Sequence, residues 1–413
     1  MIIPLNHRNK IFLVFALGIL ISLFYAIFNL SKFDKNEQNQ HLMIRGDIHQ
    51  VWSEAESFKI DLSKNKTIFG NGEVYTRTFL QSKIIAINSF LSGEDLYENY
   101  NNKIVKLEGK LIHLIFQIIV YYLSLLYLYK KLLIYYDYKN VSFFIVAYLS
   151  LDPNIIQWHG TFWTESIFLS LQIILIALLI TRNKSNIFCL SLGLFLGLMF
   201  LQKTVSIFYI IFISLFIYFE KHQNVKSKIL SLFMGFIIIL SLLGYDNYKK
   251  TDIFYVMPLQ TKAAHRMSLI PQLLNEKDDL NSLNQLEKLE EDWMKKNNLS
   301  WENFYLLTNF DKRYEFRKLQ QKNSIEIILD NKILTTKIYI KKIIHHLVLN
   351  PLQTFYWHKY NQVKYKQEFH LSDESKKYLI FKIFYSLIFY SILFLGFLSV
   401  LKDKKNLKFY SLL

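Results

Sequence analysis

The residues best suited to catalysis lie close together near the N-terminus, shortly after the first long apolar run. They are Asp47, His49 and Glu54. A carboxylate at that place could act as general base on an acceptor hydroxyl or amine. Asp47 also fits a plainer role, because an acid followed three residues later by Gln50 is typical of a helix start. Both roles stay open for Asp47, whereas Glu54 is expected to be a solvated helix charge.

Two basic residues could bind an anion. Arg77 begins an amphipathic run, where it is either a snorkelling arginine or a contact to a phosphate. Lys203 interrupts an apolar block, after a Gly193-x-x-x-Gly197 pair that would let helices approach closely. A lysine at such a place either snorkels to a membrane surface or holds a lipid-linked phosphate as a point charge.

A third group occupies a short turn between two apolar runs. Asp152 precedes a proline, as expected of a helix cap, and Glu165 would lie in the first turn of the next helix, where the macrodipole favours an anion. Trp158, His159 and Trp163 surround these acids. Because aromatic faces are apolar surfaces with a polar rim, this turn is equally consistent with caps and with a sugar-binding shelf.

The elements that must position these residues are apolar helices. Of the 413 residues, 52% are hydrophobic, and they form long blocks separated by Lys- and Asn-rich stretches. The net charge of +16 does not indicate nucleic acid, since the lysines mostly flank apolar blocks. Cys189 is the only cysteine, which excludes an intramolecular disulfide and a cysteine metal cluster. The expected fold is an all-α polytopic membrane protein with about eight spans: Ile11–Leu30, Leu111–Tyr129, Val141–Leu151 (with a start as early as Leu132 left open), Phe162–Ile180, Ile187–Leu201, Thr204–Phe219, Ile229–Tyr245 and Tyr378–Leu401.

The predicted organisation has five parts. They are a first span (1–30), an outer loop with juxtamembrane helices (31–110), spans two to seven (111–245), a helical outer loop (246–377), and a last span with a basic cytoplasmic tail (378–413). With eight alternating spans, the lysines and arginines of the short loops fall on one side, which the positive-inside rule makes cytoplasmic. Both long polar segments and the turns at 152–161 and 202–203 then fall together on the outer side.

Amphipathic stretches are expected within both outer loops. A helix over 48–60 would place Val51, Ala55 and Phe58 on one side. The run 78–91 could lie on the membrane. In the second loop a charged middle, 275–298, indicates a solvated helix and loop, and 325–349 interleaves Ile and Leu with Lys.

Taken in their order along the chain, several motifs resemble those of the multi-helix membrane glycosyltransferases of the GT-C fold, in the protein-mannosyltransferase and aminoarabinose-transferase-like group. The matching positions are Asp47 after the first span, Arg77-Thr78-Phe79-Leu80 through Gly93, Thr164-Glu165, Gly193 to Lys203, Tyr245-Asp246-Asn247-Tyr248, and Asn350-Pro351. The resemblance implies inverting transfer of a hexosyl or pentosyl group from a polyprenyl-phosphate donor to a glycan, lipid or protein acceptor. The Lys-, Asn- and Ile-rich composition suggests a bacterial source, so the expected location is the bacterial cytoplasmic (inner) membrane, with the site facing the periplasm or exterior.

The resemblance also implies roles for the residues. Asp47 would be the catalytic base, and Arg77 and Lys203 would bind the donor phosphate. The sugar or acceptor pocket would be lined by Glu165, Trp163, Trp158, His159 and Asp152. No residue is assigned to a metal, no cofactor is certain, and a divalent metal stays open. Membrane lipids are the other expected partner, and nucleic acid is not one. The alternatives are a non-catalytic protein of glycan export, either flippase or scaffold, and an O-antigen polymerase-like or ligase-like enzyme.

Overall fold

A computed structural model describes residues 5–31, 47–63, 79–93, 95–99, 104–105, 111–135, 139–181, 185–219, 224–300, 304 and 309–349. Arg77 and the last predicted span, Tyr378–Leu401, lie outside these residues. The described chain is almost wholly helical, as predicted, apart from one short antiparallel pair of strands in which Tyr97 lies opposite Val105.

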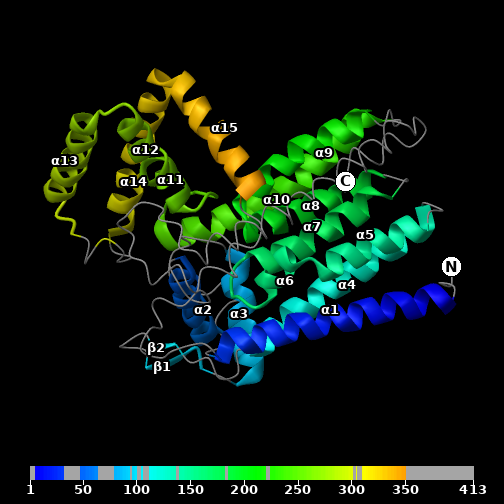
Figure 1. The fold of residues 1–413 in the computed structure, drawn as a ribbon. Coiled ribbons are helices and arrows are strands. Elements are labelled where there is room, and N and C mark those ends of the chain that lie inside the picture. The colour runs from blue at the N-terminus through cyan, green and yellow to red at the C-terminus, as the bar shows by residue number, and fades with distance from the viewer. Residues whose placement is uncertain are drawn as a thin grey trace, which may run out of the picture. The chain divides into compact units, whose positions relative to one another are not determined.

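The chain divides into two compact units, each assembled from segments that are distant in sequence. The described elements of the first unit are α1 (Leu5–Ser31), β1 (Tyr97–Asn99), β2 (Ile104–Val105), α4 (Leu111–Tyr135), α5 (Lys139–Leu151), α6 (Pro153–His159) and α7 (Glu165–Leu179) (Figure 1). Those lying wholly or mainly in the second unit are α2 (Asp47–Ser63), α3 (Phe79–Ser92), α8 (Asn186–Gln202), η2 (Thr204–Ser206), α9 (Ile207–Phe219), α10 (Val225–Thr251), α11 (Leu259–Ser268), α12 (Ile270–Glu276), α13 (Leu280–Lys296), α14 (Phe310–Asp330) and α15 (Lys332–Leu349).

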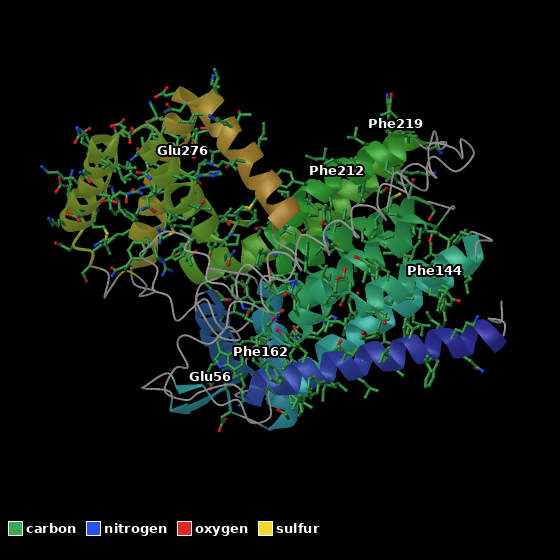
Figure 2. All side chains as sticks on the ribbon, in the orientation of Figure 1. Glu56, Phe144, Phe162, Phe212, Phe219 and Glu276 are labelled. Atoms are coloured by element: carbon green, nitrogen blue, oxygen red, sulfur yellow. The ribbon has the colours of Figure 1, made fainter. Side chains whose placement is uncertain are left out.

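Apolar helices dominate the described chain. Three are long and apolar enough to cross a membrane: Asn9–Phe28, Leu111–Tyr135 and Val225–Thr251. Four shorter apolar helices cover Val141–Leu151, Glu165–Leu179, Asn186–Gln202 and Thr204–Phe219. Large apolar side chains project outward from several of them, including Phe144, Phe212 and Phe219, each about two-thirds exposed (Figure 2). Such exposed apolar faces are costly in water and normal in lipid, so the chain is a membrane-associated α-helical protein.

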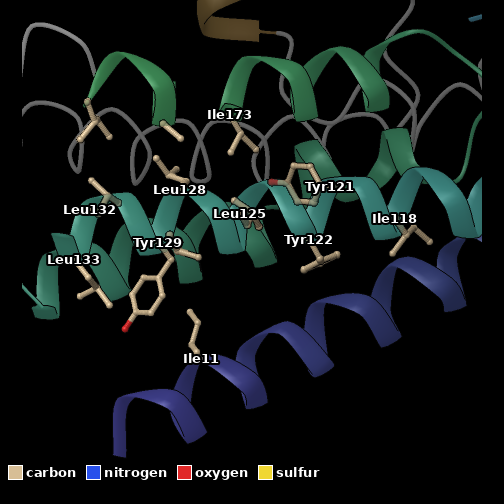
Figure 3. Packing of buried hydrophobic residues seen from close by; sticks show 13 residues of the cluster. Ile11, Ile118, Tyr121, Tyr122, Leu125, Leu128, Tyr129, Leu132, Leu133 and Ile173 are labelled. Carbon is tan, nitrogen blue, oxygen red and sulfur yellow. The ribbon is translucent and has the colours of Figure 1, made fainter. Parts of the chain in front are cut away.

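Helix α4 is the centre of the first unit. Its residues supply most of the buried cluster in Figure 3, and α1, α5 and α7 pack around it. The hydroxyls of Tyr121 and Tyr122 donate to the carbonyls of Leu149 and Ser150 at 2.7 and 2.8 Å, which fastens the end of α5 to α4. Gly18 allows α1 to approach closely, because a methyl group there would overlap the Tyr122 hydroxyl and the Ser150 carbonyl.

The end of α4 differs from the prediction. The span was expected to stop at Tyr129, with a start of the next apolar helix as early as Leu132 left open, but α4 continues to Tyr135 and α5 begins only at Lys139. The ammonium of Lys131 lies 5.4 Å from the ring centroid of Tyr127 and 5.9 Å from that of Tyr135. These rings, one helical turn before and after the lysine, accommodate its charge, so the basic pair does not end the helix.

In the second unit α8 and α10 pack backbone to backbone. A methyl group at Gly193 would overlap the carbonyl of Leu232, and one at Gly235 would overlap the carbonyl of Leu190. The close approach expected from the Gly193–Gly197 pair is therefore confirmed, and its partner is the glycine-containing helix α10. Helix α3 also contacts α8.

The polar helices α11 to α15 form their own core within the second unit. Apolar residues of α12, α13 and α15 meet in one buried cluster, which includes Ile270, Leu273, Leu274, Leu286 and Ile338. This core lets the long polar segment fold as a helical layer rather than as a loop.

The helix boundaries in this segment agree only in part with the prediction. The charged stretch 275–298 is largely the helix α13, as predicted. The stretch 325–349, predicted to be amphipathic, is divided between the end of α14 at Asp330 and α15. The side chain of Asn331 donates to the carbonyl of Ile327 at 2.8 Å and so caps the end of α14.

Helix α2 begins at Asp47 and buries Val51, Ala55 and Phe58, as predicted. The prediction for Glu54 is wrong. Its side chain is buried, only 9% exposed, rather than solvated. Glu54 lies three residues after Val51 and four before Phe58, so it shares the buried face of α2 with these apolar residues.

Candidate functional site

The turn between α5 and α7 in the first unit gathers the largest group of predicted site residues. Asp152 directly follows α5, and its carbonyl accepts from the amides of Ile155 and Ile156, each at 3.0 Å. The proline at the first position of α6 has its backbone angle set for a helix and lacks only an amide that would have no partner there. The side chain of Asp152 is buried at 7% exposure. The predicted helix start at this acid is confirmed.

His159 closes α6 and lies in the interior. Its Nδ1 is 2.8 Å from the hydroxyl of Ser166, and its ring centroid is 4.5 Å from that of Tyr121. Its Nε2 is buried and has no hydrogen-bond partner among the described residues. Burial lowers the pKa of His159 from 6.5 to about 3. The imidazole is therefore neutral at physiological pH, with one nitrogen engaged by a serine.

The backbone after α6 is held by α4. The side-chain amide of Gln117 donates to the carbonyl of Thr161 at 2.9 Å, while its buried Oε1 has no partner in the part of the chain that the structure describes. One turn earlier, the ring of His113 lies 5.5 Å from that of Phe162. His113, Gln117 and Tyr121 thus form a polar stripe at every fourth position of α4, on the side that faces α6 and the start of α7.

The polar stripe of α4 was not among the site residues predicted from the sequence. The signal that could have found it is polar residues at spacing i, i+4 and i+8 within an otherwise apolar helix, because burying such groups in a membrane helix is costly unless they are bonded to a partner. Ser166 was missed for the same reason. It lies in the first turn of α7 and fixes the ring of His159.

Glu165 and the two tryptophans occupy a less buried part of the turn. Helix α7 begins at Glu165 rather than at Phe162, because residues 161–164 form the turn. The acid lies in the first turn, as predicted, and accepts a hydrogen bond from the Thr164 hydroxyl at 3.2 Å. Trp158 and Trp163 are half-buried, as is Glu165.

Lys203 belongs to the second unit, at a second break between apolar helices. It follows the last residue of α8 with an extended backbone, and its amide donates to the carbonyl of Met199 at 2.8 Å. The side chain is half-buried. Beside it in sequence, Gln202 is fully buried and donates to Gln81 of α3 at 2.8 Å. The buried hydroxyl of Ser206 has no hydrogen-bond partner within the described ranges.

The remaining predicted residues are only partly described. Asp47 is the first residue of α2, which confirms the predicted helix start but not a role for its side chain. Arg77 lies outside the described residues. Within the described part of the chain, no group of three or more His, Cys, Asp or Glu side chains could hold a metal ion.

What the fold and the turn define is a class: a membrane-associated helical protein with a buried polar network at a break between apolar helices. Comparisons with protein-family models, with curated proteins and with solved structures find no match. The resemblance to GT-C glycosyltransferases therefore stays a prediction from the sequence.

Proposed function

We propose that this chain is a multi-pass glycosyltransferase of the bacterial cytoplasmic membrane. It takes one sugar from a polyprenyl-phosphate donor and passes it to an acceptor on the outer side. About eight spans, most of them at the apolar helices described above, bring the polar turn and both long polar segments to that side. The lipid part of the donor stays in the bilayer while its head group is exchanged.

The observation that carries this proposal is the polar network of the turn between α5 and α7. A sugar offers hydroxyls that both donate and accept hydrogen bonds, and a buried polar atom without a partner costs about 1–3 kcal/mol. Gln117 Oε1 and His159 Nε2 are two buried atoms that lack a partner among the residues described. Half-buried Trp158 and Trp163 add aromatic surface of the kind that sugar rings pack against.

In the proposed reaction an acceptor hydroxyl attacks the anomeric carbon, its bond to the sugar forms, and the bond from the sugar to the lipid-linked phosphate breaks. Asp47 takes the proton of the attacking hydroxyl. Lys203 and Arg77 stabilise the charge that develops on the departing phosphate. The residues that hold the sugar are Asp152, Glu165, His159, Trp158 and Trp163.

The test is to incubate purified protein in nanodiscs with a polyprenyl-phosphate donor carrying one radiolabelled sugar, and with candidate acceptors. The proposal expects label to leave the lipid and free polyprenyl phosphate to accumulate. A flippase or scaffold would leave the donor intact. A polymerase-like or ligase-like enzyme would use a donor with a preassembled chain and ignore the single sugar.

A further inference from the structure

Helix α15 exposes an unusual face. Its 18 residues contain Lys332, Lys337, Lys341 and Lys342 and no acid. One side, made of Leu334, Thr335 and Ile338, is packed into the core that α12 and α13 share. The other side is exposed to solvent.

The open side combines charge with apolar area. Ile333 is 88% exposed and Ile340 is 52% exposed, and Lys337 and Lys341 lie between and beside them at spacings of i+4 and i+8 from Ile333. These four residues share one face of a helix, which we name the basic stripe. Exposed isoleucines in a polar helix are costly in water, and interleaved lysines are typical of helices that lie in the plane of a membrane surface.

Neighbouring groups leave most of this charge available. The carboxylate of Glu276 in α12 is 3.8 Å from the ammonium of Lys341, whose side chain is 73% exposed. A pair so open to solvent is worth little. Tyr339 lies outside the stripe, toward the packed side of the helix; it is 40% exposed, and its hydroxyl is 3.3 Å from Nδ1 of His265.

Helix α13 of the same unit differs from α15 in charge. It is also amphipathic and exposes Leu280 and Leu289, at 55% and 60%. However, its three lysines are outnumbered by four acids, which are Glu287, Glu290, Glu291 and Asp292. An anionic surface would repel this helix and attract α15.

We propose that the basic stripe of α15 docks on an anionic lipid surface, with Ile333 and Ile340 entering the head-group region and Lys337 and Lys341 contacting lipid phosphates. This contact goes beyond the proposed transfer reaction. It would hold the polar helices α11 to α14 against the membrane in which the apolar helices of the chain are anchored.

The experiment places an environment-sensitive fluorophore at position 333 by Ile333→Cys in a Cys189→Ala background, since Cys189 is the only native cysteine. The full-length protein is studied in nanodiscs of phosphatidylcholine, with or without phosphatidylglycerol, using uncharged acrylamide as aqueous quencher. The matched control carries the probe at Leu289→Cys on α13. The proposal expects quenching at position 333 to fall about threefold in anionic nanodiscs, with no change at position 289.

Reversing the charge of the stripe shows whether lipid or protein shields position 333 from the quencher. Lys337→Glu with Lys341→Glu should restore acrylamide access at position 333, whereas Lys288→Glu with Lys295→Glu on α13 should not. Equal access at positions 333 and 289 in anionic nanodiscs would overturn the proposal. Protection that is the same in neutral nanodiscs and survives the reversal on α15 would also overturn it, because the stripe would then be covered by protein.

Discussion

The two breaks between apolar helices differ in charge and in bonding. The turn between α5 and α7 holds two acids, Asp152 and Glu165, and no lysine or arginine. The break between α8 and η2 holds Lys203 and no acid. In the first, the buried side chains of Gln117 and His159 bond the backbone and Ser166, whereas in the second the buried neutral pair is Gln202 with Gln81. Each break also holds one half-buried charge at a helix end.

Each charge matches the helix end at which it lies. Glu165 is in the first turn of α7, where the macrodipole is positive, and Lys203 follows the last turn of α8, where it is negative. Neither residue therefore needs a ligand to be stable. The buried neutral network of the first turn is different, because its stability depends on keeping His159 uncharged.

The largest predicted difference between the two breaks is their response to acid. Unfolded His159 takes up a proton near pH 6.5, while the folded pKa of about 3 keeps it neutral. Stability is therefore complete above pH 6.5 and falls as the pH drops toward 3, and the loss reaches about 2 kcal/mol at pH 5. Hydrogen-exchange protection of α6 should fall between pH 7 and pH 5, whereas protection of α8, whose side chains do not titrate in that range, should not.

The variant His159→Gln is the control for that experiment. It should flatten the pH dependence of α6 while leaving α8 as before. An equal loss of protection in α6 and α8, or an unchanged acid response in the variant, would contradict the role given to the buried neutral imidazole.

A smaller effect is expected from the serine that holds the imidazole. Ser166→Ala removes the partner of His159 Nδ1 and leaves it buried without one, so it should destabilise the protein by about 1.5 kcal/mol. Ser170→Ala is the matched control, because the Ser170 hydroxyl only donates back to the carbonyl of Ser166 one turn earlier. Thermal unfolding in detergent measures both. Equal shifts in Tm for the two variants would mean that the contact between Ser166 and His159 contributes no stability.

The smallest effect is expected at the second break, and on function rather than folding. Lys203→Ala should raise the KM for lipid donor about tenfold with Tm unchanged, because a half-buried lysine at a helix end contributes little to stability. Lys203→Arg should retain most of the donor affinity. An unchanged KM in Lys203→Ala would remove this residue from the proposed phosphate site.

The apolar helices were largely predictable as helices, because long apolar blocks separated by lysine-rich stretches indicate them, but only three of those described are long and apolar enough to cross a membrane. The Gly193–Gly197 pair also predicted close packing correctly, although its partner Gly235 was not identified. The predicted end of α4 was wrong because the pair Lys130-Lys131 was interpreted as the end of the helix. Tyrosine rings one turn to either side accommodate Lys131, so α4 runs past the basic pair.

The candidate site was less predictable. Asp152, His159 and Glu165 could be selected because prolines, aromatics and acids are conspicuous at a turn. Their surroundings could not, since the polar stripe of α4 becomes meaningful only when the turn packs against it. Glu54 could have been recognised from the local pattern, because it lies three residues after Val51 and four before Phe58, on the buried face of α2.

The proposed transfer chemistry is tested most directly by Asp47→Asn, measured as release of labelled sugar from a polyprenyl-phosphate donor. Asp61→Asn, at the other end of α2, is the control for a lost carboxylate on the same helix. Since a general base contributes about 10²- to 10⁴-fold, we predict a loss of that size for Asp47→Asn, wild-type release for Asp61→Asn, and unchanged folding of both. Wild-type release by Asp47→Asn would contradict the mechanism.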